Sequence, residues 1–161
     1  MRKHWTGVVC LVAVVGGLSA CGGGGSSTGG TAAGTGITKR AYARQADAIC
    51  RAGIASKNAA LRATFAELAP GSRKYATRQA QEELVRTVVL GPFERMAREV
   101  ADLPPPESET ARVRSMARLL DRGVERMSEH PGLALTNEEA LFGRWNAAAR
   151  AYGMRVCSHI R

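Results

Sequence analysis

The chain has 161 residues, of which 45% are hydrophobic and 5% aromatic, and its formal net charge is +9. This length fits one domain with its own core, which argues against an assembly of several domains. No segment alternates apolar and polar residues for long enough to predict a β-strand, whereas a helical spacing of apolar residues recurs along the chain. The pattern therefore predicts an all-α fold.

The first residues predict a secretory signal peptide over residues 1–20. Arg2 and Lys3 supply a basic start, the apolar run GVVCLVAVVGGLSA follows, and small residues end it. A transmembrane helix is the alternative, but it needs about 20 apolar residues. The run over residues 5–20 is shorter than that and has no basic stop after it. We therefore expect this segment to direct export.

The end of the segment, Leu18-Ser19-Ala20-Cys21, resembles the lipobox of bacterial lipoproteins at all four positions. The resemblance implies that Cys21 receives a diacylglyceryl group, that the signal peptide is cut just before it, and that the new amino terminus is acylated, for example with palmitate. Several acyl chains give stable membrane binding, so the implied location is extracytoplasmic and lipid-anchored. A buried or disulfide-bonded Cys21 is disfavoured because its neighbours cannot build a core.

Residues 21–37 are predicted to form a flexible tether behind this anchor. They are Gly, Ser, Thr and Ala residues without periodicity, which is the composition of a flexible coil. About 15 such residues have a typical reach of roughly 20 Å. That reach clears a lipid headgroup layer without fixing the orientation of the tethered domain.

The domain over residues 38–161 is predicted to begin with a long helix over residues 38–69, which Pro70-Gly71 stops. Its apolar residues recur at steps of three and four, as on one face of a helix. These residues are Ala43, Cys50, Ile54, Leu61, Phe65 and Leu68.

A second helix is predicted from a cap at Ser72 to the LPPPES motif at residues 103–108. Gly91-Pro92 lies inside its pattern, and proline removes a backbone donor and clashes with the preceding turn. We therefore expect a kink or a short break at this point. The apolar set of this helix is Leu84, Val88, Val89, Phe93, Met96 and Val100.

The third helix is predicted over residues 108–129, closed by His130-Pro131-Gly132. A capping box then predicts the start of the fourth helix, with Thr136 as the cap and Glu139 reaching back. This helix is expected to run to about Ser158. Four helices joined by short turns predict an up-down-up-down bundle. The inward-facing residues are Val113, Met116, Leu120, Val124 and Met127 in the third helix, and Leu141, Trp145, Ala148, Tyr152 and Val156 in the fourth.

The cysteines predict one disulfide bond, between Cys50 and Cys157. Cys10 leaves with the signal peptide and Cys21 carries lipid, and the compartment outside the membrane permits oxidation. In an antiparallel four-helix arrangement the start of the first helix lies beside the end of the fourth. The same pairing predicts that Gly53 lies near Gly153.

Two stretches, YARQADAIC and AAARAYGMRVC, resemble the terminal helices of small uncharacterised lipoproteins from actinobacteria. Those proteins also carry one cysteine near each end of a helical domain. The resemblance implies no known activity.

No pattern in the sequence predicts catalysis, a metal or a cofactor. His130 and His159 lack a partner at a catalytic spacing, and we expect His130 to cap a helix. Glu82-Glu83 and Glu138-Glu139 diverge on a helix and do not form carboxylate pairs. Cys50, Cys157 and His159 together fall short of a four-ligand zinc site, because Cys157 and His159 diverge.

Arginines at every fourth position of the third helix are candidate anion contacts: Arg114, Arg118, Arg122 and Arg126. Asp121, Glu125 and Glu129 share that face, at the i,i+3 spacing of surface ion pairs. We therefore expect a solvated face of mixed charge. Nucleic acid is excluded by the predicted location and by the lack of an aromatic platform beside the charges.

The predicted function is that of a non-enzymatic binding or interaction module, held to the membrane through Cys21 and meeting an envelope protein partner. An envelope enzyme or its accessory subunit is one alternative, and a purely structural envelope component is another. A deep pocket with a buried, unpaired acid or histidine would favour the enzyme, and one exposed apolar patch would favour a protein partner. Whether Trp145 and Tyr152 line a pocket or only the core stays open.

Overall fold

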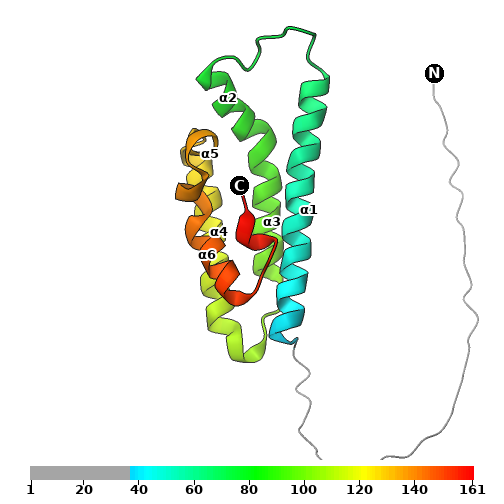
Figure 1. Cartoon of the computed structure of the whole chain (residues 1–161). Coiled ribbons are helices and arrows are strands. Elements are labelled where there is room, and N and C mark those ends of the chain that lie inside the picture. The colour runs from blue at the N-terminus through cyan, green and yellow to red at the C-terminus, as the bar shows by residue number, and fades with distance from the viewer. Residues whose placement is uncertain (1–36) are drawn as a thin grey trace, which may run out of the picture. The chain divides into compact units, whose positions relative to one another are not determined.

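The computed structural model describes residues 37–161, so the predicted signal peptide, Cys21 and the tether up to residue 36 lie outside the described residues. Within the described part, the chain forms an all-helical bundle without strands. Its long helices run up, down, up and down in chain order (Figure 1). The predicted bundle is confirmed.

Helix α1 (Lys39–Ala66) begins at Thr38, whose hydroxyl accepts the backbone N–H of Ala41 at 3.2 Å. This side-chain cap satisfies one of the free amide groups of the first turn. The helix ends slightly earlier than predicted, with Glu67 as its C-cap. The chain then turns at Gly71, which has a φ of 77°.

The second long helix comprises α2 (Arg78–Leu84), a π-helical turn η1 (Val85–Val89) and α3 (Leu90–Asp102). Its cap is Thr77, whose hydroxyl accepts the backbone N–H of Ala80 at 3.2 Å. The prediction of Ser72 as the cap is therefore wrong. The Ser72 hydroxyl instead accepts the N–H of Lys74 at 3.3 Å, inside the preceding turn.

The irregularity expected at Gly91-Pro92 lies just before it. The helix continues through these two residues, and the π turn takes up the misfit, with the N–H of Leu90 donating to the carbonyl of Val85. Pro92 has no N–H for the helical ladder, and Gly91 has no Cβ to clash with the proline ring. A π turn is a common way to absorb such a defect. As a result, α2 leans away from α1 while α3 stays beside it (Figure 1).

Helix α4 (Thr110–Glu129) follows a short 3₁₀ turn, η2 (Glu107–Glu109), and ends at His130. The backbone N–H of His130 donates to the carbonyl of Arg126 at 2.8 Å. The third helix therefore closely matches its predicted range.

Two shorter elements follow, α5 (Leu133–Thr136) and α6 (Glu138–Tyr152). The cap of α6 is Asn137, whose Oδ1 accepts the N–H of Ala140 at 3.1 Å. The predicted capping box is therefore wrong, because the Thr136 hydroxyl donates to the carbonyl of Gly132 at 2.9 Å within the preceding turn.

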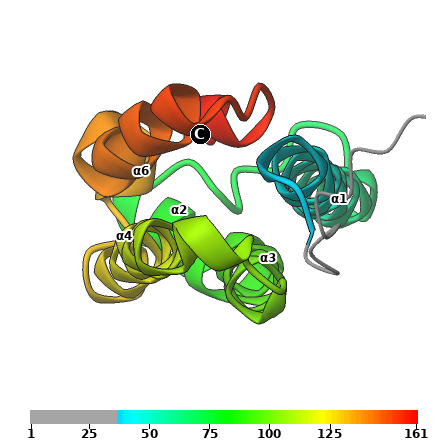
Figure 2. The ribbon, with the colours of Figure 1, turned by 90° about the horizontal axis from the view of Figure 1, so that it is seen from below.

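Helix α6 ends earlier than predicted, at Gly153, which has a φ of 100°. This left-handed residue reverses the chain, and residues 154–161, here called the return segment, run back between α6 and α1 (Figure 2). They include the 3₁₀ turn η3 (Cys157–His159), which contacts both helices. The return segment thus closes the side of the bundle between its first and last helices.

A disulfide bond joins Cys50 of α1 to Cys157 of the return segment, with their Cα atoms 5.4 Å apart. The predicted pairing is confirmed, although Cys157 reaches α1 from the return segment and not from a continuous fourth helix. The expected approach of Gly53 to Gly153 is wrong. Gly53 packs against α3, where a Cβ would lie 2.9 Å from Sδ of Met96.

The core is filled from all the long helices and from the return segment, where Met154, Cys157 and Ile160 are buried. Trp145 is buried and donates its indole N–H to the carbonyl of Cys157 at 2.8 Å. It is therefore a core residue. Among the described helices, none combines the length and the apolar character needed to cross a bilayer.

Candidate functional site

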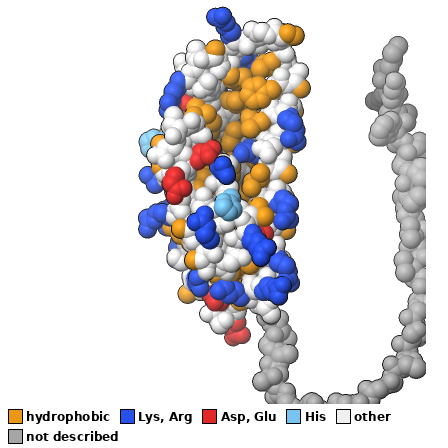
Figure 3. Space-filling view, in the orientation of Figure 1, with side chains coloured by type: hydrophobic (Ala, Val, Ile, Leu, Met, Phe, Trp, Pro, Cys, Tyr) orange, Lys and Arg blue, Asp and Glu red, His pale blue; other side chains and the backbone are white. Residues whose placement is uncertain are grey.

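An apolar groove of about 250 Å³ opens where α2 leans away from α1. In the space-filling view it is a hydrophobic patch on the half of the molecule farther from the start of α1 (Figure 3). Its lining residues are Lys57, Leu61, Phe65, Leu84, Val85, Val89, Phe93, Met127, Ala134, Leu135, Glu138, Leu141, Phe142 and Arg161.

The groove exists because the apolar stripe of α1 extends beyond the part of the helix that the core buries. The stripe is buried at Ala43 and Cys50, whereas Leu61 is half-buried and Phe65 is 47% exposed. Leu135 of α5, on the same groove, is 40% exposed. These two are the large hydrophobic residues whose side chains are most exposed among the described residues. Exposed apolar side chains that gather around one depression mark an interaction site more often than scattered ones do.

The π turn contributes directly to this groove, because Val85 and Val89 line it. A π turn inserted in an α-helix is frequently found at a functional site. Here it lets the preceding helix lean out, so the same defect that accommodates Pro92 also holds the groove open.

The floor of the groove consists of closely packed aromatic rings, and its rim carries charged side chains. Phe93 and Phe142 stack with their ring centroids 5.3 Å apart and are almost fully buried. On the rim, Nζ of Lys57 donates to the carbonyl of Arg161 at 2.9 Å and lies 5.8 Å from the centroid of the Phe93 ring. Glu138 is the acid among the lining residues.

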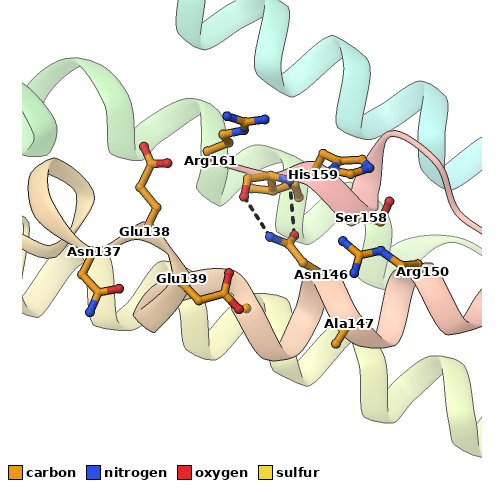
Figure 4. Close-up of a pocket in the computed structure, with 11 residues that line it drawn as sticks. Asn137, Glu138, Glu139, Asn146, Ala147, Arg150, Ser158, His159 and Arg161 are labelled. Atoms are coloured by element: carbon orange, nitrogen blue, oxygen red, sulfur yellow. Dashed lines mark hydrogen bonds between the residues drawn. The ribbon is translucent and has the colours of Figure 1, made fainter.

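A larger polar pocket, of about 550 Å³, lies between α6 and the return segment (Figure 4). Asn146 spans it, since Nδ2 donates to the carbonyl of Ile160 at 3.1 Å and Oδ1 accepts the N–H of Ile160 at 3.3 Å. Glu139 and His159 lie on opposite sides of Asn146 (Figure 4). They form no acid–base pair, and the pocket is best described as the seam that holds the return segment.

The histidines and acids considered from sequence stay apart. His130 is exposed at the C-cap of α4, and His159 is exposed in η3. Over residues 37–161, no three His, Cys, Asp or Glu side chains are grouped so as to hold a metal ion. Cys50 and Cys157 are joined to each other.

The four arginines at every fourth position of α4, Arg114 to Arg126, are all exposed, as predicted. The expected ion pairs with Asp121, Glu125 and Glu129 do not form within 4.0 Å in the described part of the chain. Arg126 instead donates to the carbonyl of Ala140 at 3.2 Å. Burial raises the pKa of Asp121 above its ordinary value, and the nearby charge of Arg122 offsets only part of this effect. The face carries both signs of charge without fixed pairs.

Tyr152 is both a core residue and the wall of another pocket. Its ring packs edge-on against Tyr42, with the centroids 5.8 Å apart, and it lines a basic pocket near the start of α1. Burial raises the pKa of Tyr152, Glu109 raises it further, and Arg112 opposes both effects. Sequence reasoning therefore located Tyr152 but left its pocket undecided.

Sequence reasoning missed the groove, although it named Leu61 and Phe65 as stripe residues. The signal in the sequence was the length of the apolar stripe of α1, which extends beyond the part of the helix that a closed bundle would bury. Asp47, which holds the return segment, was also missed, since its partners are backbone groups more than a hundred residues away.

Compared with known proteins, the chain matches no family model, no curated protein and no solved structure.

Proposed function

We propose that this protein is a lipid-anchored, extracytoplasmic binding module without catalytic activity, and that its apolar groove takes an apolar segment of an envelope protein. The observation that carries the proposal is the open groove itself, with Phe65 and Leu135 exposed on its edge. The groove holds neither a buried acid nor a histidine among its lining residues, so it offers recognition and no acid–base chemistry.

The size of the groove favours a few side chains over a whole small molecule. Drug-sized ligands occupy roughly 300–1,000 Å³, whereas this groove measures about 250 Å³. One or two large apolar side chains fit that volume. Helical walls on several sides suit an amphipathic helix that inserts its apolar face.

The rim adds a preference for charge. Among the charged side chains that line the groove, Lys57 and Arg161 outnumber Glu138. A partner helix with acidic residues beside its apolar face therefore complements the groove, because opposite charges at a rim steer association. The proposed partner is an amphipathic, acidic segment of a membrane or envelope protein.

The groove is tested with a photoreactive amino acid at position 135, in cells that express the full chain. We expect a discrete protein adduct from position 135, lost when Phe65→Ser is added. The same probe at Leu119, a half-buried apolar residue of α4 outside the groove, serves as the matched control. Adducts to lipid, or equal adducts from both positions, would contradict a protein partner.

The anchor is tested separately with Cys21→Ala. We expect this variant to lose metabolic labelling with a radiolabelled fatty acid and to leave the lipid-anchored membrane fraction. Labelling that persists in the variant would show that Cys21 is not the modified residue.

A further inference from the structure

A basic pocket of about 560 Å³ lies at the end of the bundle where α1 begins. Lys39, Arg40 and Arg44 come from the first turns of α1, and Arg155 comes from the return segment. The space-filling view shows basic side chains gathered at this end of the molecule, close to where the described chain starts (Figure 3). The remaining lining residues are Ala43, Asp47, Tyr152 and Gly153.

The basic side chains of this pocket outnumber its one acid, Asp47, so the lining keeps an excess of positive charge. Asp47 accepts the backbone N–H groups of Arg155, Val156 and Cys157 at 2.8, 2.8 and 3.0 Å, so its oxygens are directed at the return segment and away from the basic side chains. Over the described range, none of the four basic side chains has a carboxylate within 4.0 Å. Four cations and one carboxylate thus line the cavity, and within the described residues none of the four cations is in a direct ion pair.

The position of two of these cations opposes helix stability. The start of a helix carries a partial positive charge that favours acidic residues. Helix α1 has no acid in its first turn and carries Lys39 and Arg40 there instead. A residue that is unfavourable for the secondary structure that contains it often belongs to a functional site. An anion in the pocket would offset both the side-chain charges and the helix dipole.

The wall formed by Tyr152 keeps a lysine at the pocket. Nζ of Lys39 lies 4.9 Å from the centroid of the Tyr152 ring, in cation–π range. Arg112 also lies over that ring, at 5.2 Å, and pairs with Glu109 at 3.7 Å. The buried hydroxyl of Tyr152 has no hydrogen-bond partner among the described residues.

We propose that this basic pocket binds the phosphate group of an anionic lipid headgroup. Arginine and lysine together suit this group, because guanidinium forks bind phosphate oxygens in pairs and an ammonium adds a point charge. The short stretch of chain between the proposed anchor at Cys21 and this pocket indicates a membrane lipid as the source of the phosphate. Residues 22–38 separate Lys39 from Cys21 along the sequence, and the tether predicted there from composition would reach roughly 20 Å.

This inference rests on the proposed anchor at Cys21. With the anchor in the bilayer, the pocket is the part of the domain nearest to the headgroups along the chain, and the apolar groove lies toward the other end of α1. Headgroup binding would therefore orient the module, with its groove directed away from the lipid.

The test is the reactivity of lysines in the mature, lipidated protein bound to vesicles. After residue 20 the chain has three lysines, Lys39, Lys57 and Lys74, and Lys74 is exposed in the loop at the far end of α1. A water-soluble amine-acylating reagent is applied to protein on phosphatidylcholine vesicles, with and without phosphatidylglycerol, and mass spectrometry measures each lysine. We expect phosphatidylglycerol to slow modification of Lys39 about fivefold and to leave Lys74 unchanged.

Two charge-matched variants separate the pocket from general attraction. Arg40→Gln with Arg44→Gln should restore the reactivity of Lys39 on phosphatidylglycerol vesicles. Arg114→Gln with Arg118→Gln removes the same charge from exposed residues of α4 and should leave Lys39 protected. Equal effects of the two variants would overturn the proposal, as would equal protection of Lys39 and Lys74.

A third arm adds inorganic phosphate to phosphatidylcholine vesicles. Protection of Lys39 in this arm equal to that given by phosphatidylglycerol would overturn the assignment to a lipid headgroup in favour of free phosphate. Failure of the anchor is a different result. Protein without a lipid on Cys21 would not float with phosphatidylcholine vesicles, which is measured before any labelling.

Discussion

Oδ1 of Asp47 lies 2.8 Å from the backbone nitrogen of Val156, so a side chain of α1 caps the segment that follows α6. The same carboxylate also accepts the N–H groups of Arg155 and Cys157. One turn farther along α1, Cys50 is bonded to Cys157. Two adjacent turns of the first helix therefore hold the return segment, by hydrogen bonds and by a covalent bond.

Replacing Asp47 with Ala should lower the free energy of unfolding by about 2–3 kcal/mol, because three backbone N–H groups lose a charged acceptor. Asp47→Asn keeps one acceptor oxygen and should cost less. Urea denaturation measures both. Asp102→Ala, which removes an exposed carboxylate at the end of α3, is the control and should change stability little. An Asp47→Ala variant as stable as this control would contradict the capping role.

Removing the disulfide bond should lower the free energy of unfolding by about 2–5 kcal/mol, since the bridge spans a sequence separation of 107 residues and restricts the unfolded chain. Denaturation of the oxidised protein is compared with that of the Cys50→Ala, Cys157→Ala double variant. Trp145 reports the transition, because its indole contacts Cys157 and it is the tryptophan that remains after residue 20. Two free thiols in the purified native protein would refute the bridge.

Gly123→Ala should lower the free energy of unfolding by about 1–3 kcal/mol. A Cβ at this position would lie 2.7 Å from ring atoms of Phe142 and 2.9 Å from the carbonyl oxygen of Leu141, so α4 and α6 would have to move apart. Ser115→Ala, at an exposed position of the same helix, should be neutral or slightly stabilising. Thermal denaturation of the two variants distinguishes close packing from helix propensity, which alone would make Gly123→Ala stabilising.

The stability of the protein should fall in alkaline solution through Tyr42. Burial, followed by the neighbouring Tyr152, raises the pKa of Tyr42 from 10.0 to about 12. Below pH 10 the phenol is neutral in both states, so its contribution is fully present. Between pH 10 and about 12 the unfolded state loses this proton first, and stability falls by up to about 3 kcal/mol. Tyr42→Phe should flatten this part of the pH profile. An unchanged slope would show that Tyr42 is not the group responsible.

Phe65 and Phe93 should respond very differently to truncation, although both line the groove. Phe65 is 47% exposed, so Phe65→Ala should cost about 1 kcal/mol or less. Phe93 is 2% exposed and stacked on Phe142, so Phe93→Ala should cost about 3–5 kcal/mol. Similar losses for the two variants would mean that the groove is closed in solution.

Local signals in the sequence predicted the helices, whereas the pairing of Cys50 with Cys157 was predicted by eliminating Cys10 and Cys21 and from the antiparallel order of the helices. Helical periodicity is a short-range property, and a proline or a glycine marks most of the ends. The caps were less predictable. Ser72 and Thr77, or Thr136 and Asn137, lie a few residues apart and have similar capping strength. The choice between them depends on which hydroxyl is already bonded within the preceding turn.

The groove and the basic pocket came from long-range packing. The apolar stripe of α1 has the same spacing around Cys50 as around Phe65, but other helices bury only its first half. The second half stays open because the π turn before Pro92 tilts α2 away from it. Likewise, Arg155 joins Lys39 because Gly153 reverses the chain and Asp47 holds the returning backbone. No periodicity encodes these placements, since they depend on where whole helices lie relative to one another.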